Sequence, residues 1–236
     1  MEKGKKLYEG KAKILYQTND PNLLIQYFKD DATAFDGIKK GTIVGKGVAN
    51  NKISCNLFDL LKQHGIDSHF DRKLSDNEML VKNVNIVPVE VVVRNISTGS
   101  LCKRYGVDEG IVFGTPIVEL YYKDDSLHDP LMNDDHVTAM ELATREELAS
   151  MREQALKINK ILQDFFDSIE IKLVDLKLEF GRFKKQIILA DEISPDTCRF
   201  WEKGTNRKLD KDRFRQDLGD VEKTYNEMMN RIVGKS

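Results

Sequence analysis

The strongest constraint on the fold is an alternating stretch, VDLKLEFG, at residues 174–181. Successive side chains of a β-strand point to opposite faces of its sheet. One face of this predicted strand is apolar and carries Val174, Leu176, Leu178 and Phe180. The other face carries Asp175, Lys177 and Glu179. Because Thr, Ser or Gln would suit a merely wet strand face better than Asp or Glu, this row of charges indicates a functional site.

A second strand is expected directly after this one, in KQIILADE at residues 185–192. Antiparallel pairing would bring Asp191 near the level of Asp175 or Lys177. Glu179 and Asp191 then offer hard oxygen ligands, and Mg²⁺ takes one or two carboxylates together with substrate phosphates. Lys177 between them would neutralise phosphate charge. The structural alternative is an exposed ladder of opposite charges, which is ordinary between paired strands.

A glycine turn near the N-terminus is a candidate phosphate-binding hairpin. YEGKAKI, residues 8–14, places Lys11 and Lys13 directly behind Gly10, between two strand-like runs. Lysine binds phosphate as a point charge, so such a hairpin can close over a polyphosphate. It is not a Walker A loop, because the GxxxxGK[ST] pattern is absent. Basic hairpin tips are usually just solvated, so this motif alone is a weak indication.

A third stretch, VEVVVRNISTGS at residues 89–100, predicts a strand that ends at Arg94. The Ser/Thr/Gly loop after it leads to Ser100, which is expected to cap a short helix. Backbone N–H groups at a helix start, with hydroxyls and an arginine, form a phosphate cradle. The structural alternative is a capped turn in which Arg94 forms an ion pair.

A proline-stiffened loop follows the candidate metal ligand, in DEISPDTCRFW at residues 191–201. It presents Asp196 and Arg199, and the single tryptophan, Trp201, is expected to pack rather than to bind a ligand. A further acid–base cluster, DRFR at 212–215, reads as a solvated helix start or as an additional part of the site.

The rest of the chain predicts an α+β protein with two lobes, because strands dominate its first part and helices its second. Strands are expected at 5–30, 78–82 and 84–94. Helices are expected at 48–64, from a capping box at Thr144, and at 220–233 with Asp220 as N-cap.

Composition excludes several classes of protein. A formal net charge of −2 argues against a nucleic-acid binder, which usually carries a basic excess. No stretch approaches the roughly 18–20 apolar residues of a membrane span, and the first residues lack the apolar core of a secretory signal. Three widely spaced cysteines argue against a disulfide framework and favour a cytoplasmic location. The four histidines form no recognisable zinc pattern.

Six motifs in this chain resemble, in their usual order, the SAICAR synthetase family, the phosphoribosylaminoimidazole-succinocarboxamide synthases of purine biosynthesis. They are YEGKAK at 8–13, AFDG at 34–37, GKG at 45–47, RNISTGS at 94–100, VDLKLEFG at 174–181 and DEISPDTCRFW at 191–201. The resemblance spans nearly the whole chain, and the last two motifs are the specific ones.

The resemblance implies antiparallel sheets with flanking helices, in a two-lobed fold distantly similar to ATP-grasp enzymes and protein kinases. A mainly β lobe, 1–83, would cover ATP, and an α+β lobe, 84–236, would hold the metal and ribonucleotide sites. The implied reaction joins L-aspartate to the carboxylate of carboxyaminoimidazole ribonucleotide (CAIR), with ATP, to give SAICAR, ADP and phosphate. The resemblance also implies Mg²⁺ as cofactor, these small molecules as the partners, and a homodimer.

The resemblance also places particular residues near the site. Lys11, Lys13 and Lys177 are expected at the ATP phosphates, and Glu179 and Asp191 at Mg²⁺. Lys177, Asp175 and, more weakly, Lys123 form the expected catalytic group. Arg94 and Ser100 are expected to hold the phosphate or the carboxylate of the ribonucleotide. The residues expected to position the ribonucleotide or the aspartate are Asp36, Asp196, Arg199 and Arg215.

Two other functions fit the residues less well. A small-molecule kinase of similar architecture would transfer phosphate to a hydroxyl and would not need aspartate. A non-catalytic nucleotide-binding or scaffold protein would be expected to lose a metal ligand or a phosphate lysine, yet all five of these residues are present: Lys11, Lys13, Lys177, Glu179 and Asp191.

Overall fold

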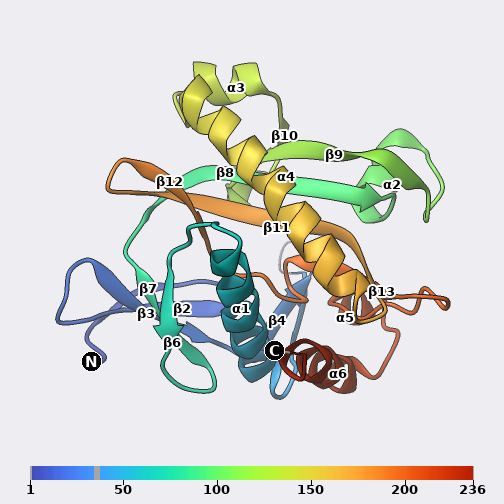
Figure 1. Ribbon diagram of the computed structural model, residues 1–236, viewed down its shortest axis with the longest axis horizontal. Coiled ribbons are helices and arrows are strands. Elements are labelled where there is room, and N and C mark those ends of the chain that lie inside the picture. Colours follow the sequence, from blue (N-terminus) through green and yellow to red (C-terminus); the bar gives the residue numbers. More distant parts are fainter. Residues whose placement is uncertain (1, 35–37, 236) are drawn as a thin grey trace.

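The computed structural model describes residues 2–34 and 38–235 and has an α+β architecture built on two antiparallel sheets (Figure 1). The first sheet has the order β1-β2-β3-β7-β6. Its strands are β1 (Lys6–Glu9), β2 (Lys13–Gln17), β3 (Leu23–Phe28), β7 (Glu78–Lys82) and β6 (Phe70–Lys73). A separate hairpin joins β4 (Asp31–Ala34) to β5 (Lys39–Thr42). The sequence prediction of an α+β fold is confirmed.

The second sheet carries most of the candidate site and has the order β10-β9-β8-β11-β12, with β13 pairing on β11. Its strands are β10 (Leu131–Met132), β9 (Val112–Tyr122), β8 (Asn85–Ile96), β11 (Ile171–Phe183), β12 (Gln186–Ala190) and β13 (Cys198–Glu202). The central strand, β11, contains the alternating stretch. It pairs with β8 along one edge and with β12 and β13 along the other.

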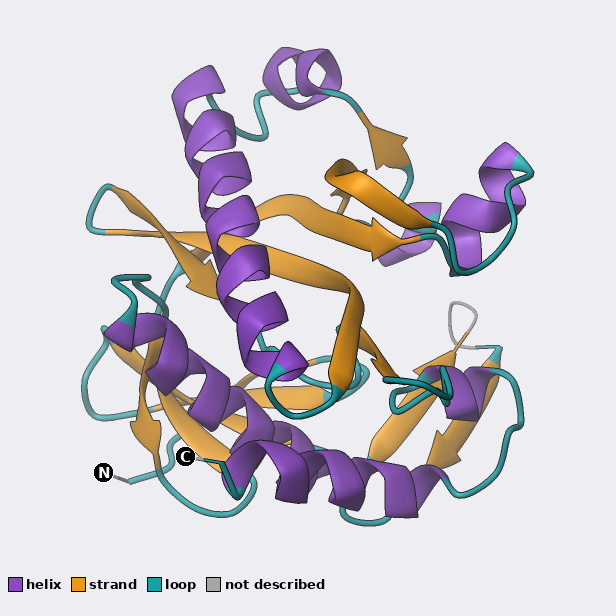
Figure 2. Ribbon diagram, turned by 45° about the vertical axis from the view of Figure 1, so that its right-hand side comes forward, coloured by secondary structure: helices purple, strands orange, loops and turns teal. Residues whose placement is uncertain are grey.

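Helices flank the two sheets (Figure 2). They are α1 (Lys46–Gln63), α2 (Gly99–Tyr105), α3 (Asp134–Ala139), α4 (Arg145–Asp167), α5 (Asp212–Arg215) and α6 (Val221–Val233), with a 3₁₀ turn at Asp125–Leu127. The long helix α4 crosses the second sheet, and α1 packs against the first sheet and against α6. No helix in these described ranges is long and apolar enough to span a membrane.

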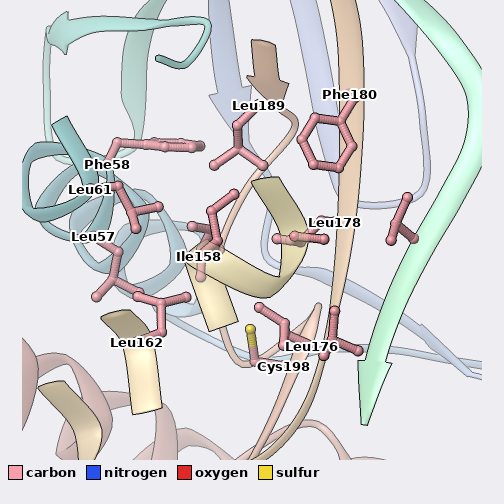
Figure 3. Close-up of a cluster of buried hydrophobic side chains, with 14 of the residues drawn as sticks. Leu57, Phe58, Leu61, Ile158, Leu162, Leu176, Leu178, Phe180, Leu189 and Cys198 are labelled. Carbon is pink, nitrogen blue, oxygen red and sulfur yellow. The ribbon is translucent and has the colours of Figure 1, made fainter. Parts of the chain in front are cut away.

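One hydrophobic core joins the two sheets (Figure 3). Leu57 and Phe58 of α1 and Ile158 of α4 meet Leu178 and Phe180 of β11, and all five side chains are almost fully buried. Burial of each such side chain contributes about 1.5–3 kcal/mol. Because this core is continuous, it fixes the position of the N-terminal sheet relative to β11, and therefore the position of the β1–β2 hairpin relative to the charged residues of β11.

The alternation of β11 is interrupted at one point that the sequence pattern does not reveal. The pairing of β11 with β13 shifts register between Leu173 and Asp175, as at a β-bulge. Val174 therefore leaves the face of Leu176 and packs with Ile96 and Trp201 in a separate buried cluster. The expectation that Val174 shares the main apolar face is wrong, whereas the expectation that Trp201 packs in the interior is confirmed.

The helices begin close to their predicted positions, but two of the three predicted side-chain caps do not form. Thr144 closes the expected capping box with Glu147 at the start of α4. In contrast, Asp220 precedes α6 with a positive φ of 49° and makes no side-chain cap. Helix α2 begins at Gly99, so Ser100 lies inside the helix and does not cap it. The hydroxyl of Ser100 instead accepts a hydrogen bond from Arg94.

Candidate functional site

Two pockets open on the charged side of β11. The first, here called the inter-sheet pocket, has a volume of about 360 Å³ and is lined by residues of both sheets. Its apolar part comes from the first sheet and from the start of β8, and its charged part comes from Lys13, Lys123, Glu179 and Asp191. A pocket that is apolar at one side and charged at the other suits a ligand with an apolar body and a charged end.

The second, here called the arginine pocket, has a volume of about 310 Å³. Arg94, Arg199 and Arg215 line it, together with Ser100, Tyr121, Asp175, Lys177 and Asp196. Lys177 lines this pocket and Glu179 lines the other, only two residues apart on the same face of β11. The two pockets therefore adjoin along this strand.

The strand pairing produces a cluster of carboxylates and lysines between the pockets. Glu179 of β11 lies directly opposite Glu90 of β8. Like charges opposite each other destabilise a sheet, but Lys177 Nζ donates to both, at 2.6 Å to Glu90 and 3.1 Å to Glu179. Lys123 Nζ adds a second contact to Glu179 at 2.8 Å. Burying two opposed carboxylates lowers the stability of the fold. Their presence here therefore indicates a function and not a structural role.

Asp191 joins the same cluster from the other side. Glu179 pairs with Ala190 of β12, so Asp191 follows at the level of Leu178, one residue from its expected level. Lys13 of the N-terminal sheet contacts the carboxylate of Asp191 and lies 2.9 Å from that of Glu192. The fold therefore brings the hairpin lysine and the candidate metal ligand, 178 residues apart in sequence, into direct contact.

The pKa values in this cluster follow from burial and charge. Burial opposes ionisation of Glu179, but Lys177, Lys123 and Lys13 outweigh it and lower its pKa to about 2. Burial and the neighbouring Glu179 raise the pKa of Asp191. Burial also raises the pKa of Glu90, against the effect of Lys177. Perturbed carboxylates of this kind gather at functional sites.

Asp175, on the central strand of its sheet, holds two of the arginines that line the arginine pocket. Arg94 of β8 is opposite Asp175 on one side, and Arg199 of β13 is opposite it on the other. Both guanidinium groups donate to Asp175, at 3.0 and 2.9 Å. Asp212 then accepts from Arg199 at 2.8 Å and from Arg215 at 2.6 Å. A chain of alternating charges thus orients three arginines around one pocket.

Asp196 is tied down more firmly than its loop position suggests. Lys46 and Lys211 contact one of its oxygens, at 2.9 and 3.2 Å, and the hydroxyl of Tyr225 donates to the other at 2.6 Å. Burial opposes ionisation, but the two lysines outweigh it and hold the pKa of Asp196 well below its usual value. The carboxylate therefore anchors the loop 192–199 to α1 and α6, as well as lining the arginine pocket.

Two predicted site residues are not placed in either pocket. Lys11 lies at the hairpin tip, is exposed, and pairs with Asp125 at 2.7 Å across a separate hollow. Asp36 lies outside the described residues. All other predicted residues line one of the two pockets.

Sequence reasoning missed several residues that the fold brings to the site. Glu90 gave a signal, since it is a charged residue within a run of valines, VEVVVR. Lys46 lay in the GKG motif, but nothing in the sequence showed that it is fully buried against Asp196. Glu192 lay in the DEISPDTCRFW motif but was given no role, and Tyr121 gave no signal because its place depends on the pairing of β9 with β8. Among the described ranges, no three histidine, cysteine or acidic side chains are grouped to hold a metal by themselves.

Comparison with known proteins agrees with these motifs. The SAICAR synthetase family model matches residues 6–232. The phosphoribosylaminoimidazole-succinocarboxamide synthase of Thermoanaerobacter sp. (strain X514) is 56% identical over 234 residues, covering 99% of this chain and 100% of that protein. The crystal structure of the corresponding synthase from Ehrlichia chaffeensis superposes with a TM-score of 0.95 at 45% identity, covering 97% of this chain and 98% of that one. A SAICAR synthetase in complex with ADP gives a TM-score of 0.93 at 50% identity, with 96% and 97% coverage. The chain therefore belongs to the SAICAR synthetase family.

Proposed function

We propose that this chain is an ATP-dependent ligase of purine biosynthesis, which joins L-aspartate to the carboxylate of CAIR and yields SAICAR, ADP and phosphate. Relatives that align with this chain over essentially their whole length are named phosphoribosylaminoimidazole-succinocarboxamide synthase. The observation that carries the proposal is the cluster of Glu90, Lys177, Glu179, Lys123 and Asp191 at the boundary of two adjoining pockets. Such a boundary is where a phosphoryl group would pass from one substrate to another.

The inter-sheet pocket is the proposed ATP site. Leu15, Leu24 and Val81 supply its apolar side, which suits a nucleobase, and Lys13 supplies positive charge at the other end. A SAICAR synthetase of the same fold binds ADP. We assign the phosphates to the end where Lys13 and Lys123 lie, because positioning and charge neutralisation are the main requirements of phosphoryl transfer.

Mg²⁺ fits the carboxylates at this end of the pocket. Glu179 and Asp191 line it and present hard oxygen donors, and the pKa of Glu179, about 2, keeps its carboxylate ionised. A pair of carboxylates plus substrate phosphates is an ordinary Mg²⁺ ligand set. Bound there, the metal would supply positive charge that offsets phosphate repulsion. Lys13 would move its contact from Asp191 towards Glu192 and the phosphates.

The arginine pocket is the proposed ribonucleotide site. Arg94, Ser100 and Arg199 present guanidinium and hydroxyl groups that suit a phosphate monoester. Lys177 lies between this pocket and Glu179, so the carboxylate of CAIR would be placed near the ATP phosphates. A carboxylate is a poor electrophile, and we propose that its phosphorylation gives an acyl phosphate that the aspartate amine attacks. Asp175 lies within reach of the ribonucleotide and orients both arginines.

The remaining expectations stay proposals. We assign the aspartate to the side of the arginine pocket where Arg215 and Asp196 lie, and Asp36 stays a predicted contact of the ribonucleotide or the aspartate. Lys11 is proposed to turn from Asp125 to the ATP phosphates when the nucleotide binds. A division into lobes 1–83 and 84–236 is supported by the separate sheets on either side of residue 83. A homodimer is retained from the family resemblance, and a cytoplasmic location from the three widely spaced cysteines.

The test of the proposed function is a coupled ADP-release assay in which each substrate is omitted in turn. We expect ADP release only when ATP, CAIR, L-aspartate and Mg²⁺ are all present. A small-molecule kinase would release ADP without aspartate, and a non-catalytic nucleotide-binding protein would release none under any condition.

A further inference from the structure

A buried glutamate lies directly behind the arginine pocket and is not among the residues that line it. Glu119 is on β9, opposite Val92 of β8, and is only 7% exposed. One of its oxygens accepts from Arg94 Nε at 2.6 Å and from the hydroxyl of Tyr121 at 2.8 Å. Its other oxygen lies 3.3 Å from Arg104 Nη2. Neither the sequence motifs nor the chemistry proposed above assign a role to this residue.

These contacts fix the guanidinium of Arg94 on every edge. Its Nε is held by Glu119, its Nη1 donates to Asp175, and its Nη2 donates to Ser100 Oγ at 3.0 Å and to the hydroxyl of Tyr121 at 3.2 Å. An arginine whose fork is oriented in advance loses less conformational freedom when it binds an oxyanion. The direction in which Arg94 presents its remaining donor therefore depends on Glu119.

The same glutamate brings a second cation to this end of the pocket. Arg104 Nη2 donates to the hydroxyl of Tyr121 at 2.7 Å, and its guanidinium lies 5.6 Å from the centre of that ring. Two guanidinium groups repel each other, and one buried carboxylate between them offsets this repulsion. Glu119 thus holds a pair of cations whose combined charge exceeds its own, and one of them, Arg94, contacts Ser100 in the pocket wall.

We infer that Glu119 is a positioning residue, which acts through Arg94 and Tyr121 to set up the Ser100 end of the arginine pocket for a phosphate monoester. The inference rests on the proposed function, in which this pocket holds the ribonucleotide. Glu119 itself does not touch the substrate. Its effect is therefore expected on the affinity for the ribonucleotide and not on the other two substrates.

The test compares Glu119→Gln with the wild-type protein in steady-state kinetics for each substrate. The glutamine keeps one accepting oxygen but loses the charge, and its NH₂ group must face either Arg104 or both Arg94 and Tyr121, which are all donors. We expect the KM for the ribonucleotide to rise at least tenfold, while kcat and the KM values for ATP and aspartate stay within about twofold.

Glu119→Asp tests whether the position of the carboxylate matters as well as its charge. It keeps the carboxylate but withdraws it by one methylene from Arg94. A positioning role predicts a rise in ribonucleotide KM similar to that of Glu119→Gln. Should either variant fail to fold, Tyr121→Phe removes the hydroxyl that links Glu119 to both arginines, and a selective rise in the same KM is expected.

A matched control is Glu147→Gln. Glu147 forms a two-pronged ion pair with Arg182, at 2.7 and 2.8 Å, outside both pockets. This variant is expected to lower the melting temperature without changing any KM.

The inference is overturned if ribonucleotide KM stays within twofold of wild type in the folded Glu119 variants, or if all three KM values rise together. A wild-type protein that makes no product would instead refute the proposed function, so the two failures are distinguishable.

Discussion

Asp191→Asn is expected to abolish turnover while leaving the protein folded, because the backbone conformation at this position tolerates Asn. Asp191 has a φ of 64°, in the left-handed region, directly after β12. Asn adopts this region readily, whereas Ala or Leu would add strain. The change therefore removes one negative charge and leaves the backbone conformation and the side-chain shape almost unchanged.

The structure predicts opposite effects on stability and on catalysis. Burial and Glu179 raise the pKa of Asp191, so its ionised form is less favourable in the folded state than in the unfolded state. Neutralising it relieves this repulsion, and Lys13 keeps a partner because Glu192 lies 2.9 Å away. The melting temperature should therefore stay the same or rise. The lost metal ligand should lower kcat by about 10²–10³, or roughly 3–4 kcal/mol of transition-state stabilisation.

The assay is kcat at saturating Mg²⁺ together with a thermal melt. Asp220→Asn is the matched control, since Asp220 also has a positive φ, of 49°, but is exposed and pairs with Lys223. It should leave kcat unchanged. Wild-type turnover in Asp191→Asn would refute the assignment of this carboxylate to the metal, and a melting temperature well below wild type would refute the electrostatic argument.

Glu179→Gln should reduce kcat as Asp191→Asn does, and the double variant should be little worse than either alone if both bind one metal; fully additive losses in kcat would argue for separate roles. Arg94→Lys keeps a positive charge between its buried carboxylates but loses the fork, so ribonucleotide KM should rise by the equivalent of roughly 1.5–3 kcal/mol, and a rise in ATP KM instead would show that the pockets are exchanged. Burial, helped by Lys13, lowers the pKa of His69 to about 3, so its stabilising effect is present above the unfolded pKa near 6.5 and is lost as pH falls towards 3. Between pH 7 and pH 5 the wild type should lose about 2 kcal/mol more unfolding free energy than His69→Gln, and equal losses in chemical denaturation would contradict a buried neutral histidine.

The alternating stretch predicts the strand, its charged face and its partner β12, because these depend on neighbouring residues. It does not predict the bulge at Val174, since that depends on pairing with β13, more than twenty residues further along the chain. Lys177 and Glu179 were expected to act with Asp191, and the fold places all three in one cluster. Local alternation was sufficient here because the hairpin is short.

Asp175 shows where local reasoning stops. The sequence groups it with Lys177 in the expected catalytic group, and the structure places it between Arg94 and Arg199, which come from strands on either side. Arg94 forms the ion pairs of the structural alternative and also lines a pocket, in which its contact with a phosphate stays a prediction. Lys46, Glu90 and Glu119 depend in the same way on contacts between distant segments, which periodicity and motif spacing do not encode.

The central claim is that ATP activates the carboxylate of CAIR, and oxygen transfer tests it most directly. CAIR labelled with ¹⁸O in that carboxylate is converted with ATP, Mg²⁺ and L-aspartate, and the released phosphate is analysed by mass spectrometry. Phosphorylation of the carboxylate predicts one ¹⁸O atom in each phosphate, because the amine displaces the oxygen that bridges carbon and phosphorus. Phosphate without ¹⁸O, alongside normal yields of ADP and SAICAR, would contradict the account.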